Sequence, residues 1–264
     1  MKDVLKTIVN ERLKDAQEAG KKTPIETLKQ QAESITTHRS LINQLAVSHG
    51  SRQACVIAEV KKASPSAGLL CKDYNPADIA REYERSGAVG ISVLTEPRHF
   101  LGSDDDLCQV CKAVGLPVLR KDFICDKYQI YESAALGADV ILLIAAALDS
   151  YSLQELYMVA ISIGLETIIE VHTLEELDTV LPLERGIVGV NSRNLRTLKT
   201  DLSVARELVR SIPSGRIAIA ESGIRSRKDI EELQALGYKG FLVGESLMKS
   251  ANFGTQLRTM IAGV

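Results

Sequence analysis

Short β-branched runs alternate eight times with longer amphipathic, charged stretches between residue 55 and the C-terminal region. This repeated order of strand and then helix is typical of parallel strands joined by helices. The ranges expected as strands are 55–60, 89–94, 117–120, 139–144, 165–170, 187–191, 216–220 and 240–243. Eight such units fill about 210 residues, the size of one closed barrel. The sequence therefore predicts an α/β fold, a (β/α)8 TIM barrel.

Two other arrangements are compatible with the chain length of 264 residues. Dividing by roughly 150 residues per domain suggests two domains, and an open doubly wound sheet is the rival α/β architecture. A dinucleotide-binding sheet carries a G-x-G-x-x-G turn after its first strand, and no such turn follows residues 55–60. The eightfold pattern favours the barrel.

Residues 1–48 lie outside the eight units and have a helical pattern. Apolar residues recur at helical spacing in the first stretch: Val4, Leu5, Ile8, Val9, Leu13 and Ala16. Thr23, Pro24 and Glu26 fit a capping box with proline at the first helical position, so a second helix is expected to begin at Pro24. A third is expected at 41–47. We predict one domain, in which this helical extension packs on the catalytic end of a barrel formed by residues 49–264.

The charge balance narrows the class of partner. The chain has 32 basic and 34 acidic residues, so it lacks the cationic surplus that binds nucleic acid or an anionic membrane. Apolar runs such as 140–148 are far shorter than the roughly 20 residues that cross a bilayer. A signal peptide begins with a basic segment, whereas this chain has the acidic Asp3 near its start. We expect a cytoplasmic protein with a small-molecule partner, either a monomer or a homodimer.

The five cysteines show no regular spacing and are odd in number, which argues against a disulfide framework. Cys108 and Cys111 form a C-x-x-C pair, but they fall inside an expected helix with no second ligand pair nearby. We interpret them as small apolar side chains on a helix face rather than as a metal or redox site.

Polar and ionisable residues gather where the expected strands end. The period of two places one group of them on the inward face: Glu59, Lys61, Lys121, Glu170, Asn191, Arg193 and Glu221. A single lysine and glutamate could simply neutralise each other inside a barrel. Five strands ending in this way cannot be explained by stability, because each unpaired buried charge costs several kcal/mol. The carboxyl ends of barrel strands form the functional rim, so the pattern predicts a ligand of mixed charge.

Two glycine turns follow the last two strands. Glu221-Ser222-Gly223 and Gly244-Glu245-Ser246 each precede an expected helix. Either turn alone could simply connect a strand to a helix, whereas the two together favour a phosphate site formed by backbone N–H groups. His172 follows Glu170 by two residues, but no third ligand has suitable spacing, so we do not interpret it as a metal ligand.

Several blocks at these strand ends resemble the indole-3-glycerol phosphate synthase family. They include Glu59-Val60-Lys61-Lys62-Ala63-Ser64-Pro65-Ser66, Lys121-Asp122-Phe123, Asn191-Ser192-Arg193, Glu221-Ser222-Gly223 and Gly244-Glu245-Ser246. The resemblance covers essentially the whole chain, with Ala67 as a small departure. It implies ring closure of 1-(2-carboxyphenylamino)-1-deoxyribulose 5-phosphate to indole-3-glycerol phosphate in tryptophan biosynthesis. Carbon dioxide and water are lost, as in a carboxy-lyase, and no cofactor or metal is needed.

The resemblance also implies roles for individual residues. Lys121 is expected to be the general acid and Glu170 the general base, with Lys61 holding the substrate carboxylate and sharing in proton transfer. The residues expected to orient these groups are Glu59, Asn191, Glu221 and Ser222. The substrate phosphate is assigned to Lys61, Arg193, Gly223, Gly244, Glu245 and Ser246. The aromatic ring is assigned to Pro65, Phe100 and Phe123.

Two rival functions remain on the same fold. Another phosphosugar barrel enzyme, such as phosphoribosylanthranilate isomerase, would share the phosphate turns but does not call for two inward lysines or a long N-terminal extension. A non-catalytic barrel that binds a phosphate ligand would not need Lys61, Lys121 and Glu170 together.

Overall fold

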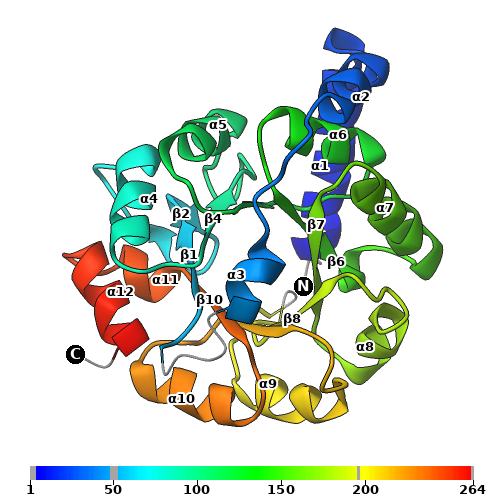
Figure 1. The fold of residues 1–264 in the computed structure, drawn as a ribbon. Coiled ribbons are helices and arrows are strands. Elements are labelled where there is room, and N and C mark those ends of the chain that lie inside the picture. The colour runs from blue at the N-terminus through cyan, green and yellow to red at the C-terminus, as the bar shows by residue number, and fades with distance from the viewer. Residues whose placement is uncertain (1–3, 48–52, 195–196, 263–264) are drawn as a thin grey trace.

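The computed structural model describes residues 4–47, 53–194 and 197–262, and its strands close a parallel barrel (Figure 1). The order around the barrel is β1-β10-β9-β8-β7-β6-β5-β4. The strands are β1 (Val56–Val60), β4 (Gly90–Leu94), β5 (Val118–Lys121), β6 (Val140–Ile144), β7 (Glu166–Val171), β8 (Ile187–Asn191), β9 (Ala218–Glu221) and β10 (Gly240–Val243). Each matches its predicted range to within two residues at either end. The predicted (β/α)8 barrel is confirmed.

Helices surround the barrel as the outer layer in Figure 1. They are α4 (Pro76–Arg85), α5 (Asp104–Ala113), α6 (Lys127–Ala135), α7 (Ser150–Ser162), α8 (Leu174–Val180), α9 (Ser203–Leu208), α10 (Arg227–Ala235), α11 (Glu245–Met248) and α12 (Phe253–Ala262). Asn75 caps α4 and Ser226 caps α10, and each side chain accepts a backbone N–H of the first turn of its helix. Among the described residues, no helix combines the length and apolar character needed to cross a membrane.

The strands direct their side chains alternately into two apolar layers. Val56 and Ala58 of β1 pack outward against the helices, whereas Ile57 faces the barrel interior. The interior layer also contains Leu119 and Ile168. Because side chains two residues apart lie on the same face, these inward rows continue toward the carboxyl ends of the strands, where they become ionisable. The rows therefore carry the polar side chains to one rim of the barrel.

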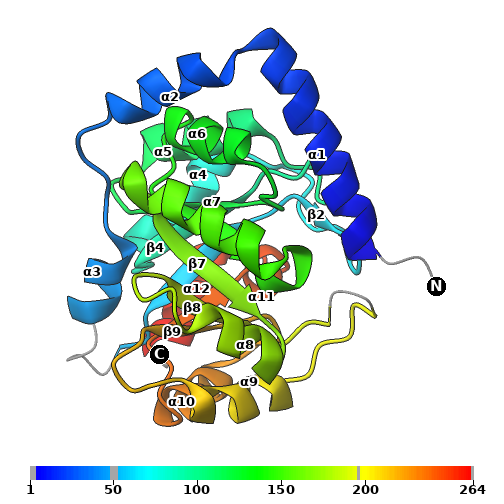
Figure 2. The same cartoon turned by 90° about the vertical axis from the view of Figure 1, so that its right-hand side faces the viewer.

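The N-terminal extension divides between the two ends of the barrel, as Figure 2 shows. Helix α1 (Val4–Lys22) crosses the carboxyl end of the strands, where Leu5 and Ile8 join the interior apolar layer. Helix α3 (Leu41–Val47) closes the opposite end, where Leu41 lies against Gly90 and Leu45 lies against Gly240. Packing of the whole extension on the catalytic end is therefore correct for α1 and wrong for α3. The amino ends of the strands also leave apolar side chains open, and α3 covers them.

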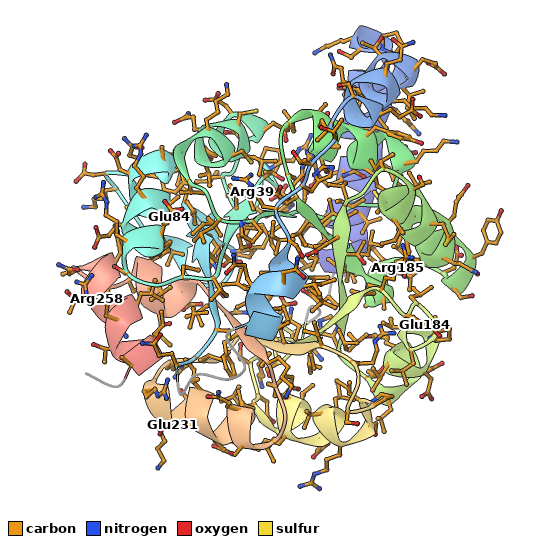
Figure 3. The ribbon with its side chains drawn as sticks, in the orientation of Figure 1. Arg39, Glu84, Glu184, Arg185, Glu231 and Arg258 are labelled. Carbon is orange, nitrogen blue, oxygen red and sulfur yellow. The ribbon has the colours of Figure 1, made fainter. Side chains whose placement is uncertain are left out.

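Polar contacts hold the middle of the extension to the outside of the barrel. Glu166 at the start of β7 accepts the backbone N–H groups of Leu41 and Ile42 at 2.8 and 3.0 Å. Arg39, labelled in Figure 3, places its Nε 2.8 Å from Asp139 Oδ2. The same guanidinium donates to the carbonyl of Val114 at 2.8 Å. These contacts bring the chain from one end of the barrel to the other.

The second helix of the extension, α2 (Ile25–Glu33), packs on α6 through Leu28 and Tyr128. It begins one residue later than predicted, with Pro24 in the cap position and no side-chain cap. The expected capping box is therefore wrong, and the Thr23 side chain instead hydrogen-bonds Tyr128. The expected boundary between residues 48 and 49 lies outside the described residues.

The C-x-x-C cysteines lie on α5, as expected. Cys108 Sγ is 3.7 Å from the carbonyl oxygen of Leu136, and Cys111 packs against Gly137. Burial raises the pKa of both thiols. Both side chains act as small apolar groups between α5 and the end of α6.

Shortening the buried side chain of Leu45 on α3 is expected to lower the stability of the protein but not its affinity for substrate. Leu45 is 1% exposed, so Leu45→Ala should reduce the free energy of unfolding by about 2–5 kcal/mol through lost burial and a new cavity. KM should stay unchanged, because the helix lies at the end opposite α1. Urea unfolding and steady-state kinetics test this, with the exposed Asn43→Ala as the matched control. An unfolding free energy equal to that of the control would contradict the prediction.

Candidate active site

A cavity of about 750 Å³ opens at the carboxyl ends of the strands beneath α1. Every residue that the sequence predicted for the site lines it: Glu59, Lys61, Pro65, Phe100, Lys121, Phe123, Glu170, Asn191, Arg193, Glu221, Ser222, Gly223, Gly244, Glu245 and Ser246. The strand ends and the two glycine turns are therefore brought together in one place.

The apolar part of the cavity wall comes mainly from side chains that the sequence analysis did not assign to the site. Leu142 and Ile144 of β6 and Leu242 of β10 line it from the barrel, and Leu5 and Ile8 of α1 line it from the extension. The signal for the strand residues was present, because all three occupy inward positions at a spacing of two. The contribution of α1 could not be read from periodicity, which gives an apolar face but not its partner.

Lys121 stands between two buried carboxylates at the bottom of the cavity. Its Nζ lies 3.1 Å from Glu170 Oε2 and 3.2 Å from Glu221 Oε2. Asn191, on the strand between those of the two glutamates, lies near Glu170 and favours its charged form. One cation thus bridges two acids on strands β7 and β9.

This arrangement shifts the pKa values of Lys121, Glu170 and Glu221 in different directions. Burial opposes the charged form of Lys121, but nearby carboxylates, chiefly Glu170 and Glu221, outweigh it and raise the pKa of the lysine. Burial likewise favours neutral Glu170, yet the charges of Lys121 and His172 lower the pKa of that carboxyl. Burial, together with repulsion from Glu170, raises the pKa of Glu221 to about 7. Near neutral pH, Glu170 is therefore ionised whereas Glu221 is partly protonated.

Lys61 and Glu59, at the end of β1, form a second ion pair in the cavity wall. Lys61 Nζ contacts Glu59 Oε1, and the side chain of the glutamate is 6% exposed. Gly244 lies directly against this carboxylate, and a Cβ at that position would overlap it. Glycine is thus required at Gly244 for close approach to Glu59, in addition to its place in a turn.

Two cationic side chains lie at the cavity mouth, and both are paired with Glu245. Arg193 Nη1 donates to Ser66 Oγ at 2.8 Å, and its Nη2 lies 3.0 Å from Glu245 Oε2. Lys249, which the sequence analysis did not assign, lies 2.6 Å from the other oxygen of Glu245. Gly223 adopts φ +82°, a conformation that exposes backbone in the turn after β9. An incoming dianion could exchange the Glu245 contacts for its own.

Aromatic side chains form one wall. Phe100 and Phe123 have ring centroids 6.2 Å apart at an interplanar angle of 39°. Pro65 lies across the mouth in the loop of the small antiparallel hairpin formed by β2 (Ala63–Ser64) and β3 (Gly68–Leu69). A flat ring could lie against these groups with its polar substituents toward the lysines.

Comparison with known proteins decides the family. The family model for indole-3-glycerol phosphate synthase matches residues 5–260. The chain belongs to the indole-3-glycerol phosphate synthase family. The indole-3-glycerol phosphate synthase of Burkholderia multivorans is 44% identical over 260 residues, which cover 98% of this chain and 99% of that protein.

Solved structures support the fold. A tryptophan synthase subunit alpha from Legionella pneumophila strain Paris superposes with a TM-score of 0.61 at 15% identity, covering 85% of this chain and 97% of that one. A thiamine phosphate pyrophosphorylase from Pyrococcus furiosus gives 0.58 at 16% identity, with 84% and 96% covered. At these identities the likeness shows the barrel fold alone.

A buried ion pair connects the extension with the site in this member of the indole-3-glycerol phosphate synthase family. Arg12 of α1 donates from Nε to Asp122 Oδ1 at 2.9 Å and from Nη2 to Oδ2 at 2.7 Å. Asp122 also accepts the Thr95 hydroxyl at 2.6 Å. Because Asp122 lies between Lys121 and Phe123, α1 is bound to the segment that carries two cavity residues. The sequence offered no signal for this pair beyond a basic residue on an amphipathic helix.

One cluster outside the cavity has ligand types that suit a metal: Glu11, Glu96 and His99. Glu96 Oε2 already accepts the backbone N–H groups of His99 and Phe100 at 2.6 and 3.0 Å. His99 Nε2 lies 2.9 Å from Glu11 Oε2. These contacts satisfy the cluster without a cation, and they attach the loop after β4 to α1.

Proposed function

We propose that this chain is an indole-3-glycerol phosphate synthase, a carboxy-lyase acting on 1-(2-carboxyphenylamino)-1-deoxyribulose 5-phosphate. The observation that carries the proposal is the pair of lysines, each held by carboxylate, in one cavity that also has an aromatic wall and a cationic mouth. Those features correspond to the ketone, carboxylate, ring and phosphate of the substrate. Family membership supports the same reaction.

The reaction needs acids, bases and a fixed pose. The anilino nitrogen supplies electrons to the ring carbon that bears the carboxylate, and this carbon attacks the ketone. Lys121 donates a proton to the ketone oxygen as the carbon–carbon bond forms. The bond to the carboxylate then breaks and releases carbon dioxide, which restores the aromatic ring. The new hydroxyl then leaves as water with a proton supplied by Lys61, and removal of a proton from the neighbouring methylene carbon completes the indole. No cofactor or metal is needed.

The remaining residues take supporting roles in this proposal. Glu170 removes the methylene proton, since its lowered pKa keeps it ionised. Lys61 holds the substrate carboxylate and shares in proton transfer, with Glu59 fixing its ammonium group. The groups that orient the reacting atoms are Asn191, Glu221 and Ser222.

The phosphate is placed at the mouth. Arg193 supplies positive charge, Lys61 adds to it, and the turns at Gly223, Gly244, Glu245 and Ser246 supply backbone donors. The ring lies against Phe100, Phe123 and Pro65. Each assignment rests on the cavity geometry together with the family resemblance.

The direct test is spectroscopic. Purified protein is incubated with the carboxyphenylamino sugar phosphate, and the indole chromophore and released carbon dioxide are followed together. Stoichiometric formation of both supports the proposal. A phosphoribosylanthranilate isomerase would consume phosphoribosylanthranilate without releasing carbon dioxide, and a non-catalytic barrel would form no product from either compound.

Substitution at the phosphate turn is expected to weaken affinity. Gly244→Ala places a Cβ where the Glu59 carboxylate now lies, so either the turn or the carboxylate that holds Lys61 must move. The KM for substrate and the inhibition constant of inorganic phosphate should both rise about 10-fold, a loss of about 1.4 kcal/mol. Gly215→Ala is the matched control, because a Cβ there meets nothing within 4 Å. A fall in turnover with both affinities unchanged would contradict the phosphate assignment.

We further propose a cytoplasmic protein, a monomer or homodimer, with no nucleic-acid or membrane partner. The near balance of 32 basic and 34 acidic residues supports the absence of a polyanionic partner. The five cysteines are free thiols, which suits a reducing compartment.

A further inference from the structure

His172 lies immediately after β7 and connects two carboxylates. Its Nε2 is 3.4 Å from Glu170 Oε1, and its Nδ1 is 3.3 Å from Glu176 Oε2. Glu176, on α8, also accepts the backbone N–H of His172 at 2.6 Å, which fixes the start of this turn. His172 does not line the cavity, so it stands behind Glu170 rather than against substrate.

The two atoms that face each other are otherwise unpartnered. Glu170 Oε1 and His172 Nε2 are buried and have no hydrogen-bond partner among the described residues. Two buried acceptors 3.4 Å apart repel each other unless a proton lies between them. A neutral imidazole protonated at Nε2 would set a bare Nδ1 against Glu176 Oε2 at 3.3 Å, so the proton belongs either to an imidazolium or to a neutral Glu170.

The surrounding charges decide between these two states. Lys121 Nζ lies 3.1 Å from the other oxygen of Glu170 and favours the ionised carboxylate. Glu176 accepts from the Nδ1 side and favours the imidazolium. Lys121 also lies 3.2 Å from Glu221, so its charge is shared between two buried carboxyls. A cationic His172 adds a second positive charge beside Glu170.

We propose that His172 is a positioning residue, an imidazolium held by Glu176 that keeps Glu170 ionised and fixes its orientation toward Lys121. The inference rests on the proposed role of Glu170 as general base. The surroundings of the ring agree with this: burial lowers the pKa of His172, but Glu176 and Glu170, with a smaller contribution from Glu221, raise it above its ordinary value.

The consequence is a pH dependence of known sign. An ionised base is required for proton removal, so activity falls on the acid side as Glu170 becomes protonated. His172 lowers the pKa of Glu170 together with Lys121. Removing the imidazolium should therefore move the acid limb of the profile to higher pH.

The test is the pH profile of kcat/KM for His172→Gln, which keeps an N–H donor of similar reach and loses the charge. The acid limb should shift upward by about one pH unit, so that activity on that limb falls ~10-fold. On the alkaline side, activity and KM should change less than about threefold. His38→Gln is the matched control, since His38 faces Asp139 at 4.0 Å far from the cavity, and its acid limb should not move.

Two further measurements keep the inference decidable if His172→Gln folds poorly. Glu176→Gln should give a smaller shift in the same direction. Nitrogen-15 NMR of labelled histidine should show both imidazole nitrogens of His172 protonated at pH 7 in the unmodified protein. A neutral imidazole at that pH, or an acid limb that stays in place in the foldable variants, would overturn the inference. Failure of the unmodified protein to form indole would instead overturn the proposed function.

Discussion

Lys121→Arg is expected to lower turnover by about 10²- to 10⁴-fold with little change in KM, because proton transfer is lost while charge is kept. Arginine would preserve a cation between Glu170 and Glu221, which hold the lysine at 3.1 and 3.2 Å. Its guanidinium stays protonated at any accessible pH and cannot deliver a proton to the forming alkoxide. Neighbouring carboxylates outweigh the effect of burial and raise the pKa of Lys121. The lysine therefore stays protonated until the ketone oxygen becomes basic enough to take the proton.

Lys61→Arg is the comparison that makes this result specific. Lys61 is paired with Glu59, and its expected task is to hold a carboxylate. A forked head fits a point-charge site poorly, so KM should rise while turnover is largely retained. Turnover and KM are measured for both variants across pH. If Lys61→Arg loses turnover and Lys121→Arg loses only affinity, Lys61 is the principal acid and the two roles are exchanged.

Glu170→Gln is expected to reduce turnover by a similar factor of about 10²–10⁴, because the amide cannot accept the methylene proton. Glu221→Gln should have a smaller effect on turnover, since that carboxyl has a pKa raised to about 7 and is partly neutral already. Steady-state kinetics of both variants at pH 6, where Glu221 is mostly protonated, provide the test. Equal losses in the two variants would show that both carboxylates share the base function.

The raised pKa of Glu221 also predicts how the stability of the protein changes with pH. Burial raises this pKa from 4.5 to about 7 in the folded state, so the protonated form is the favoured one. The contribution of Glu221 to stability is complete below pH 4.5 and is lost as pH rises through 7. Relative to the unmodified protein, Glu221→Gln should therefore gain stability between pH 5 and pH 8, by at most on the order of 3 kcal/mol. Urea unfolding at both pH values measures it, and a relative loss on the alkaline side would contradict the raised pKa.

Periodicity in the sequence was sufficient to determine the barrel, because a strand and the helix that follows it are encoded locally. The spacing of two that places Ile57 inside also places Glu59 and Lys61 inside, so the inward rows predicted the charged rim before any contact was known. The positions of the ionisable cavity residues followed in the same way, since all parallel strands of a barrel end at one rim. The chemistry expected there came from the family blocks.

Contacts between distant segments were decided only in three dimensions. The apolar faces of α1 and α3 look alike in sequence, yet α1 covers the catalytic end and α3 the other, because each end leaves an apolar opening of its own. Arg12 meets Asp122, 110 residues further along the chain, and nothing in the local sequence of α1 specifies that partner.

His172 illustrates the same limit within the site. Its spacing from Glu170 and Glu176 is visible in the sequence, but whether such side chains converge depends on the turn between β7 and α8. The sequence by itself determined which residues reach the rim, because the alternation of side chains along a strand is a local property. Tertiary structure decided which of them share protons and charge, because these interactions depend on distances of 3–4 Å between atoms on separate elements.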